Sequence, residues 1–289
     1  MLFQSPYLAV ASTVDEALEA KRQFPSARFI GGGTEVIADQ NLELLRPSGY
    51  VSLRLIDELR RIEDLPDGLR IGSTVTIARF LDHPLTEKIP LLRKAARAFG
   101  TRQIRNRGTV GGNIASGLPD RTLLPCFLAL NATVRLRSMN GTRTIALRDF
   151  LIGPRQTALG PDEILVDVTV KSAKGFQDYT MVGPRNAQFY VTASVALVVD
   201  EASRSVRLAL GNAAPTALRS PLAEAFAAKS IDWDKRNVRD SIAVRFGDIA
   251  AANCNPPSDV TSGSAYRRHA VKVMARRLLE RAFEKGPVL

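Results

Sequence analysis

The feature that most constrains this chain is a pair of glycine clusters that lie far apart in the sequence. Residues 31–35 (GGGTE) follow a short apolar strand, and residues 108–113 (GTVGGN) lie in a second glycine-rich segment. Glycine lets backbone N–H groups approach a ligand closely, and successive N–H groups in such a turn can bind an anion. Either cluster alone would equally fit a turn between strands. Together they favour an extended ligand with a diphosphate at its centre, and neither has Rossmann or P-loop spacing.

Composition excludes several other kinds of site. The 289 residues are enough for two domains, but they include only two cysteines and two histidines. Cys126 lies in an apolar helical run, where we expect a buried, unreactive thiol, and Cys126 and Cys254 are too few for an iron–sulfur cluster or a structural zinc site. His83 lies in a loop and His269 on a basic helix, so we expect neither to be catalytic. We therefore expect no catalytic residue and no metal site, and redox chemistry would need an organic cofactor.

The net charge of +11 makes nucleic acid a class to consider. The basic residues are spread along the chain, and only the segment 266–283 is densely basic, so we expect a solvated or partner-facing surface and no nucleic-acid binding. No apolar run reaches the roughly 20 residues of a membrane helix. The first residues also lack the pattern of a signal peptide. We expect no membrane span and a cytoplasmic location.

The hydrophobic pattern predicts mixed helices and strands before residue 172. Helices are expected over 13–24, capped by Thr13 with Glu16 three residues later, over 89–99 before Gly100, and as a buried run over 123–131. Strands are expected over 27–30, 50–55 and 162–171, with hairpins over 59–81 around an Asp-Gly turn and over 132–147 around an Asn-Gly turn. We expect the segment 101–122 to be irregular.

The small polar stretch 172–175 is the candidate linker. Beyond it, the segments 190–200 and 205–216 predict two strands of a new sheet. Helices are expected from about residue 220 and again over about 263–285. Both halves of the chain are therefore α+β in their element order.

Several segments resemble one known family in their order and spacing. They are RFIGGGTEV, TRQIRNRGTVGGNIASGLPDRTLLPCFLAL and DEILVDVTV, followed by RLALGNAAPTALR and SGSAYRRHAVKVMARRLL. The string from Gln103 to Ile114 is the most specific of them, and together they cover nearly the whole chain. The chain resembles the FAD-binding subunit of the molybdenum hydroxylases, the group of xanthine dehydrogenase, carbon monoxide dehydrogenase and isoquinoline or nicotinate dehydrogenase.

The resemblance implies an α+β fold in two domains. A two-lobed FAD-binding domain of the vanillyl-alcohol-oxidase (PCMH) type would span 1–171, with lobes of about 1–55 and 56–171. A small carbon monoxide dehydrogenase flavoprotein-like C-terminal domain, a three-stranded sheet with helices, would span 176–289. The implied cofactor is FAD. The implied partners are a molybdopterin-binding large subunit and a small subunit with [2Fe–2S] clusters, which would deliver electrons through FAD to an external acceptor.

The resemblance also implies the residues that bind the cofactor. The segment 28–35 would wrap the FAD pyrophosphate and neighbouring ribose, and the segment 109–113 would complete that nest from the other lobe. Phe99 and Gly100 would lie near the flavin ring or the adenine end, and Leu165 would contact the adenine side by its backbone. The full expected set is Arg28, Phe29, Ile30, Gly31, Gly32, Gly33, Thr34, Glu35, Phe99, Gly100, Thr109, Val110, Gly111, Gly112, Asn113, Ser116, Thr122, Leu165, Arg185 and Tyr190.

Some of these residues also suit plain packing roles. Phe99 can serve as a core aromatic at a helix end, and Leu165 as a core strand residue. Tyr190, which would shield the isoalloxazine, begins a strand that we expect to be buried. Ser116 would be a further polar contact to the cofactor.

Three positions depart from the family pattern. Thr122 stands where the family usually has an aspartate that binds ribityl or ribose hydroxyls, although Asp120 is close in sequence. Phe189 stands where an aspartate is common, and Pro184, next to Arg185, stands where some members carry a basic residue. The first departure affects flavin affinity and the others the acceptor side, while the fold is unaffected.

Two alternative functions fit parts of the sequence. A stand-alone flavin reductase of the same fold would resemble the bacterial cell-wall precursor reductase, but it would need substrate-side acid–base residues that we do not find. Its C-terminal half would also differ from GNAAPTALR. A scaffold subunit without FAD is favoured only by Thr122.

The departure at Thr122 gives a first prediction. If this side chain faces the sugar hydroxyls, Thr122→Asp supplies a charge-assisted hydrogen bond, which is roughly twice as strong as a neutral one. We expect FAD to dissociate more slowly from this variant when its release is followed by flavin fluorescence. An unchanged or faster release would show that residue 122 has a structural role.

Overall fold

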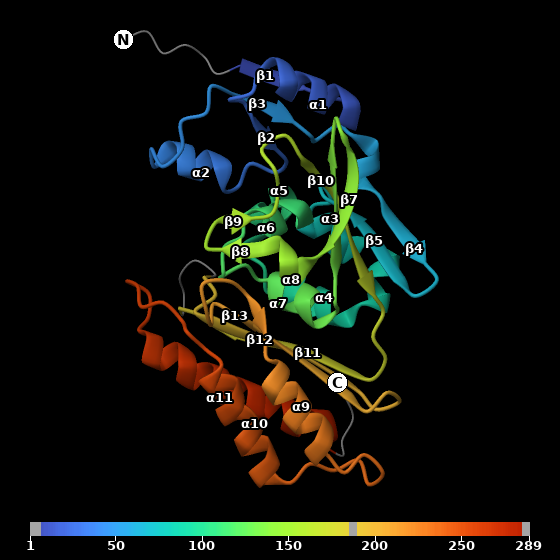
Figure 1. The fold of residues 1–289 in the computed structure, drawn as a ribbon, viewed down its shortest axis with the longest axis vertical. Helices are drawn as coiled ribbons and strands as arrows, with labels where there is room; N and C mark the ends of the chain where they lie inside the picture. The colour runs from blue at the N-terminus through green and yellow to red at the C-terminus, as the bar shows by residue number, and fades with distance from the viewer. Residues whose placement is uncertain (1–6, 185–189, 285–289) are drawn as a thin grey trace.

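The N-terminal lobe is a small parallel sheet with two helices. The computed structural model describes residues 7–184 and 190–284 (Figure 1). The strands lie in the order β1 (Tyr7–Val10), β3 (Gly49–Ser52), β2 (Arg28–Ile30), and the helices are α1 (Val14–Gln23) and α2 (Val36–Asn41). The predicted cap of α1 is confirmed, since Thr13 Oγ1 accepts from the Glu16 amide at 3.1 Å. The Glu16 carboxylate, however, binds Ser12 instead of returning to Thr13.

The second lobe is an antiparallel sheet of five strands with helices packed against it. The strand order is β4 (Ile62–Leu65), β5 (Gly68–Gly72), β10 (Ile164–Lys171), β6 (Thr133–Ser138), β7 (Gly141–Ala146). Both predicted hairpins are present, as the pairs β4–β5 and β6–β7. The expected buried helix is α7 (Leu124–Ala129), all of whose residues are buried, and the expected helix before Gly100 is α4 (Pro90–Arg97).

Two expectations for this lobe are wrong. The first hairpin ends at Gly72, and the chain then forms α3 (Ile77–Asp82), because Thr76 caps the helix and Ile77 and Phe80 share its buried face. The segment 101–122 also contains α5 (Arg102–Arg107) and α6 (Val110–Ala115), capped by Thr101 and Thr109. The remaining short elements are η1 (Asp57–Arg60), η2 (Pro84–Lys88), α8 (Leu147–Phe150), β8 (Leu151–Gly153) and β9 (Gln156–Thr157).

The C-terminal domain is an antiparallel sheet covered by three helices. Its strand order is β11 (Phe176–Val182), β12 (Ala193–Asp200), β13 (Ser205–Gly211), β14 (Leu218–Arg219), and its helices are α9 (Pro221–Ser230), α10 (Asp240–Ala252) and α11 (Ser264–Phe283). The predicted strands β12 and β13 are confirmed. Strand β11 was not predicted from the sequence, and the short β14 makes four strands where three were implied. Residues 172–175 form no helix or strand between β10 and β11.

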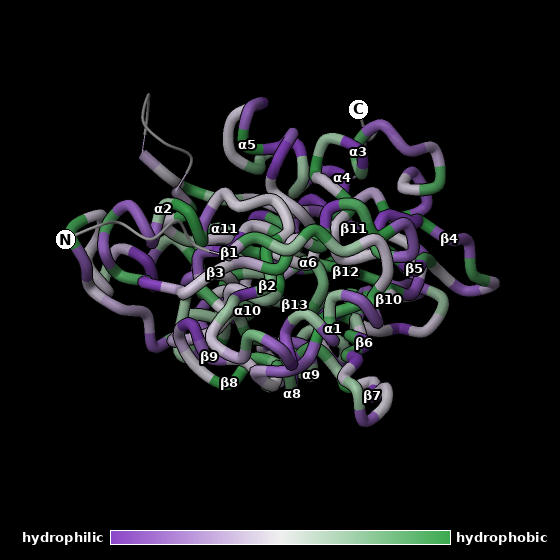
Figure 2. Tube along the Cα trace, turned by 90° about the horizontal axis from the view of Figure 1, so that it is seen from above, coloured by the Kyte–Doolittle hydropathy of each residue, from purple (hydrophilic) through white to green (hydrophobic). Residues whose placement is uncertain are grey.

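The C-terminal sheet is buried on both faces. Val195, Leu197 and Val199 of β12 pack with the three helices, whereas Ala196 and Val198 pack with the core of the second lobe. Figure 1 shows the sheet between the lobe and the helices, and Figure 2 shows that the hydrophilic stretches lie mainly in the peripheral loops. None of the helices in the described ranges is long and apolar enough to span a membrane.

A buried carboxylate joins the two domains. Asp178 of β11 is 6% exposed and accepts from Lys94 of α4, from Arg281 of α11 at 3.1 Å and from the Tyr179 amide at 2.7 Å. Its partners come from the second lobe and from the helical layer of the C-terminal domain. Asp178 therefore links three layers through one side chain.

Asp178→Asn should weaken this junction. Hydrogen bonds to charged groups contribute about 1.5–3 kcal/mol, so we expect the free energy of unfolding in urea to fall by about 2 kcal/mol. Asp67→Asn is a matched control, because Asp67 pairs with Lys171 at 3.4 Å while both side chains are mostly exposed, and such pairs contribute little. Equal urea midpoints for the two variants would contradict this role of Asp178.

Candidate cofactor site between the two lobes

The first glycine cluster forms an open turn between β2 and α2. Gly33 has a φ of +78°. Within residues 7–184 and 190–284, the amides of residues 31–35 donate no hydrogen bond to a protein acceptor. Gly31 and Gly32 line a pocket of about 250 Å³ between the lobes. Successive unbonded amides beside a pocket are the arrangement that binds a phosphate group.

Most amides of the second glycine cluster are bonded within the protein. The Val110 and Gly111 amides donate to the carbonyls of Val75 and Ser73 at 2.9 and 2.8 Å, and the Gly112 amide donates to Thr109 Oγ1 at 3.0 Å. These amides are therefore already bonded within the protein. Of residues 108–113, only Thr109 lines the pocket. These bonds fasten α6 to the sheet, whereas the Thr109 amide donates to no acceptor among the described residues, and the expectation that residues 109–113 complete the nest stays a prediction.

The space around each glycine shows which glycines are needed for backbone packing and which one leaves room for a ligand. A Cβ on Gly32 would lie 1.8 Å from the Arg107 carbonyl oxygen, and one on Gly111 would lie 2.4 Å from Ser73 Cβ. Both glycines are thus required for close backbone packing. A Cβ on Gly31 would meet nothing closer than Thr109 Oγ1 at 3.3 Å. Gly31 is therefore the glycine whose missing side chain leaves space in the pocket.

Four arginines that the sequence analysis did not single out line this pocket. They are Arg54, Arg60, Arg79 and Arg107, together with Leu55, Thr74, Thr76 and Asn106. In the described part of the chain, Arg54, Arg79 and Arg107 have no carboxylate partner, and Arg60 has only Asp57 at 3.5 Å. Arg107 belongs to the specific string Gln103 to Ile114, and this was the only sequence feature that could have pointed to any of the four arginines. The others are isolated in sequence and are brought together by the fold.

Phe99 and Thr34 meet at the junction of the lobes. Phe99 Cε1 and Thr34 Oγ1 lie 3.4 and 3.6 Å from the position that a Cβ on Gly108 would take. Gly100 has a φ of +43°, and Arg105 donates to the carbonyls of Phe99 and Gly100 at 3.0 and 2.8 Å. The structure therefore places Phe99 near Thr34 of the first glycine turn, and contact of Phe99 and Gly100 with the cofactor stays a prediction.

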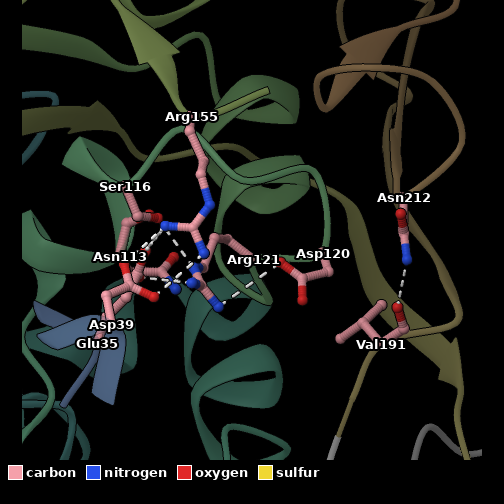
Figure 3. A network of polar contacts seen from close by, with 9 residues as sticks. All are labelled: Glu35, Asp39, Asn113, Ser116, Asp120, Arg121, Arg155, Val191 and Asn212. Carbon is pink, nitrogen blue, oxygen red and sulfur yellow. Dashed lines mark hydrogen bonds and ion pairs between the residues drawn. The ribbon is translucent and has the colours of Figure 1, made fainter. Parts of the chain in front are cut away.

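The loop after α6 carries polar side chains that lie close together (Figure 3). Ser116 Oγ donates to the Asn113 carbonyl at 3.0 Å and accepts from Arg121 Nε at 2.9 Å. Asn113 and Thr122 are buried, and Asn113 Oδ1 and Asp120 Oδ1 have no hydrogen-bond donor among the described residues. Unpaired buried acceptors are uncommon. They fit a neighbouring ligand that supplies hydroxyl donors.

Several other expected residues take up core positions. The Leu165 side chain is 5% exposed and lies in the core of the second lobe, and Phe29 packs against the core of the first. Arg28 is exposed on the edge strand β2, and Ile30 lies beside Gly33. Packing explains the side chains of Leu165 and Phe29 but not that of the exposed Arg28, and contact of these residues with the cofactor remains a prediction.

Tyr190 is half exposed and adjoins the same loop. The following residue, Val191, accepts at 2.7 Å from Asn212 Nδ2, and the Asn212 amide donates to the Pro119 carbonyl at 2.7 Å (Figure 3). The C-terminal domain thereby holds Tyr190 close to the segment that contains Thr122. Arg185 and Phe189 lie outside the described residues.

The cysteines take no part in this site. Cys126 is fully buried in α7, and burial raises the pKa of its thiol well above the ordinary value. Burial likewise raises the pKa of Cys254 to about 11. Both thiols therefore stay protonated near neutral pH and are poor nucleophiles.

Comparison with known proteins supports the same kind of site. Residues 3–170 match the family model described as the FAD binding domain in molybdopterin dehydrogenase, and residues 181–282 match that of the CO dehydrogenase flavoprotein C-terminal domain. The nicotine 6-hydroxylase medium subunit of Paenarthrobacter nicotinovorans is 30% identical, with 95% of this chain and 96% of that protein covered. The glyceraldehyde dehydrogenase medium chain of Sulfolobus acidocaldarius is 29% identical, with 91% and 93% covered.

The fold agrees with a solved structure over its whole length. Carbon monoxide dehydrogenase from Hydrogenophaga pseudoflava contains a chain that superposes with a TM-score of 0.89 at 27% identity, covering 98% of both chains. The unbonded amides of residues 31–35, the pocket beside Gly31 and its arginines all fit the diphosphate of the cofactor that the family model names. The chain therefore belongs to the family of FAD-binding medium subunits of the molybdenum hydroxylases.

Proposed function

We propose that this chain holds FAD between its two lobes and passes electrons from the [2Fe–2S] clusters of a partner subunit to an external acceptor. The observation that carries the proposal is the run of unbonded amides at residues 31–35 beside the arginine-lined pocket. The bound flavin would supply the redox chemistry, which the side chains of this protein cannot provide. The substrate would be oxidised on a molybdopterin-binding large subunit, in an assembly that we place in the cytoplasm.

The residues of this chain would bind and orient the cofactor. The amides of residues 31–35 would donate to the diphosphate, and Arg54, Arg79 and Arg107 would neutralise its charge. The attraction between these charges is stronger in a partly enclosed pocket than in water. Phe99 would pack against the cofactor, and Asn113 would accept from a hydroxyl group. Tyr190, held by the C-terminal domain, would limit access to the flavin. Backbone contact by Leu165 and a contact by Arg185 remain part of the proposal.

The basic helix α11 contributes less to partner binding than its composition predicts. Arg267 is fully buried and pairs with Asp259 at 2.6 Å, Lys272 pairs with Asp248, and Arg276 pairs with Glu280. Much of its positive charge therefore stabilises the C-terminal domain itself. Arg268 and Arg277 remain exposed on α11, and they can raise the rate at which an acidic subunit associates.

Gly31→Ala should weaken FAD binding without unfolding the protein. The added methyl group would lie in the pocket, 3.3 Å from Thr109 Oγ1. Overpacking costs about 1–3 kcal/mol, so we expect affinity for FAD, measured by flavin fluorescence titration, to fall by roughly tenfold or more. Gly263→Ala is the control, because a Cβ there would meet no atom within 4 Å. Equal affinities in the two variants would contradict the proposed site.

The proposed assembly gives a separate prediction. Expressed with its partner subunits, the chain should co-purify in a complex that contains FAD, iron and molybdenum together. Purified alone, it should bind FAD and show the visible flavin absorbance, but it should not hydroxylate an aldehyde or N-heterocycle. Hydroxylation by the isolated, metal-free chain would favour a stand-alone flavoenzyme, and a colourless chain in an active complex would favour a scaffold.

A further inference from the structure

Helix α2 carries the first glycine turn but has no hydrophobic support of its own. None of its residues is buried, and its N-terminal residue Glu35 makes no side-chain cap. Ile37 is 39% exposed and Leu42, directly after the helix, is 68% exposed. Short helices are marginal in water without tertiary packing. Some other interaction must therefore hold this segment in place.

Besides the hydrogen bond that Tyr50 of β3 donates to Gln40 of α2, ion pairs to the second lobe hold this segment. Asp39 accepts from Arg155 Nη1 at 2.7 Å and from Nη2 at 3.3 Å. Glu35 accepts from Arg121 Nη2 at 2.5 Å and lies 3.6 Å from Arg155 Nη1. Figure 3 shows both guanidinium groups reaching the two carboxylates. We call these four side chains the inter-lobe clasp.

Contacts within the second lobe hold the two arginines of the clasp in place. Arg155 lies in the β8–β9 turn with a φ of +58°, a conformation that side chains other than glycine rarely adopt. Its amide donates to the Gly117 carbonyl at 3.3 Å. Arg121 is fixed by Ser116 Oγ at 2.9 Å and lies 3.6 Å from Asp120. Unfavourable backbone conformations persist where the surrounding structure requires them.

Movement of α2 would be transmitted directly to the glycine turn. The Ile37 amide donates to the Gly33 carbonyl at 3.2 Å, and the Asp39 amide donates to the Glu35 carbonyl at 2.8 Å. The same hydrogen-bonded segment therefore contains the clasp carboxylates and the amides that face the pocket. Gly31, Gly32 and Thr34 also lie against the second lobe, at Thr109, the Arg107 carbonyl and Gly108.

We propose that Arg155 and Arg121 are positioning residues, which bind the carboxylates of Asp39 and Glu35 and thereby hold residues 31–34 in the geometry that receives a diphosphate. This inference rests on the proposed binding of FAD. The clasp is partly exposed, with side-chain exposures of 51% for Arg155 and 24% for Arg121. Dissolved salt screens such pairs over a Debye length of about 8 Å at physiological ionic strength. Part of the salt dependence of FAD binding should therefore come from the clasp.

The test compares Arg155→Gln and Arg121→Gln with Arg137→Gln in the full chain. Arg137 is the matched control, because it pairs at 2.5 Å with Asp15 of α1, also across the lobes but away from α2. Two readouts are needed: the Kd for FAD at low and high salt, and the hydrogen–deuterium exchange of residues 31–44 without FAD. We expect about tenfold weaker binding in each clasp variant, with faster exchange of this segment, and a change within about twofold in the control.

The possible outcomes separate this inference from the proposed function. A wild-type chain that binds no FAD would contradict the proposed function itself. Wild-type binding with clasp variants that match Arg137→Gln would overturn the clasp. Weaker binding with unchanged exchange would also overturn it, because the arginines would then act on the cofactor directly. If Arg155→Gln does not fold, Asp39→Asn removes the same pair from the α2 side. Restored binding in Asp39→Arg/Arg155→Asp would support the clasp, and failure to restore it in a folded double variant would count against it.

Discussion

Strand β10 contributes side chains to the cores of both lobes, between which the candidate site lies. Ile164 and Val166 face the core of the first lobe, whereas Leu165, Val168 and Val170 face the core of the second. Even-numbered residues thus face one core before residue 167 and the other core after it. The pairing of β10 with β6 shifts by one residue between Leu165 and Asp167, and such a shift turns the following side chains to the opposite face. One strand thus belongs to both cores.

Backbone hydrogen bonds link strand β10 to helix α6 beside the pocket. The Val166 carbonyl accepts from the Ser73 amide at 2.9 Å, and the Ser73 carbonyl accepts from the Gly111 amide at 2.8 Å. Gly111 lies in the first turn of the short helix α6, whose cap residue Thr109 lies beside Gly31 of the first glycine turn. The glycines of the second cluster are therefore necessary because sheet and helix approach so closely there. A ligand is not needed to explain them, which is why a substitution at Gly111 would test folding before it tested binding.

The sequence predicted elements whose signals are local, and it missed those that depend on tertiary contacts. The cap at Thr13, the two hairpins and the apolar run of α7 follow from neighbouring residues. Helices α5 and α6 were missed because the glycine-rich segment favours loops, while threonine caps favour both helices and the buried face of α6 favours the second. The first glycine turn was found from its own residues. Arg54, Arg79 and Arg155 could not be, because each stands alone in sequence and gains its role only from the partners that the fold supplies.

The distribution of positive charge connects the site to the stability of the protein. On α11, buried or paired residues such as Arg267 have carboxylate partners, so their charge is compensated inside the protein. Arg54, Arg79 and Arg107 surround a pocket without such partners in the described part of the chain, and like charges held together repel one another and destabilise the compact state. An anionic ligand removes that repulsion. A ligand that binds only the folded chain also stabilises it in proportion to the logarithm of its concentration over Kd. The arginines that we propose to bind the diphosphate would therefore also make the stability of the junction between the lobes depend on the cofactor.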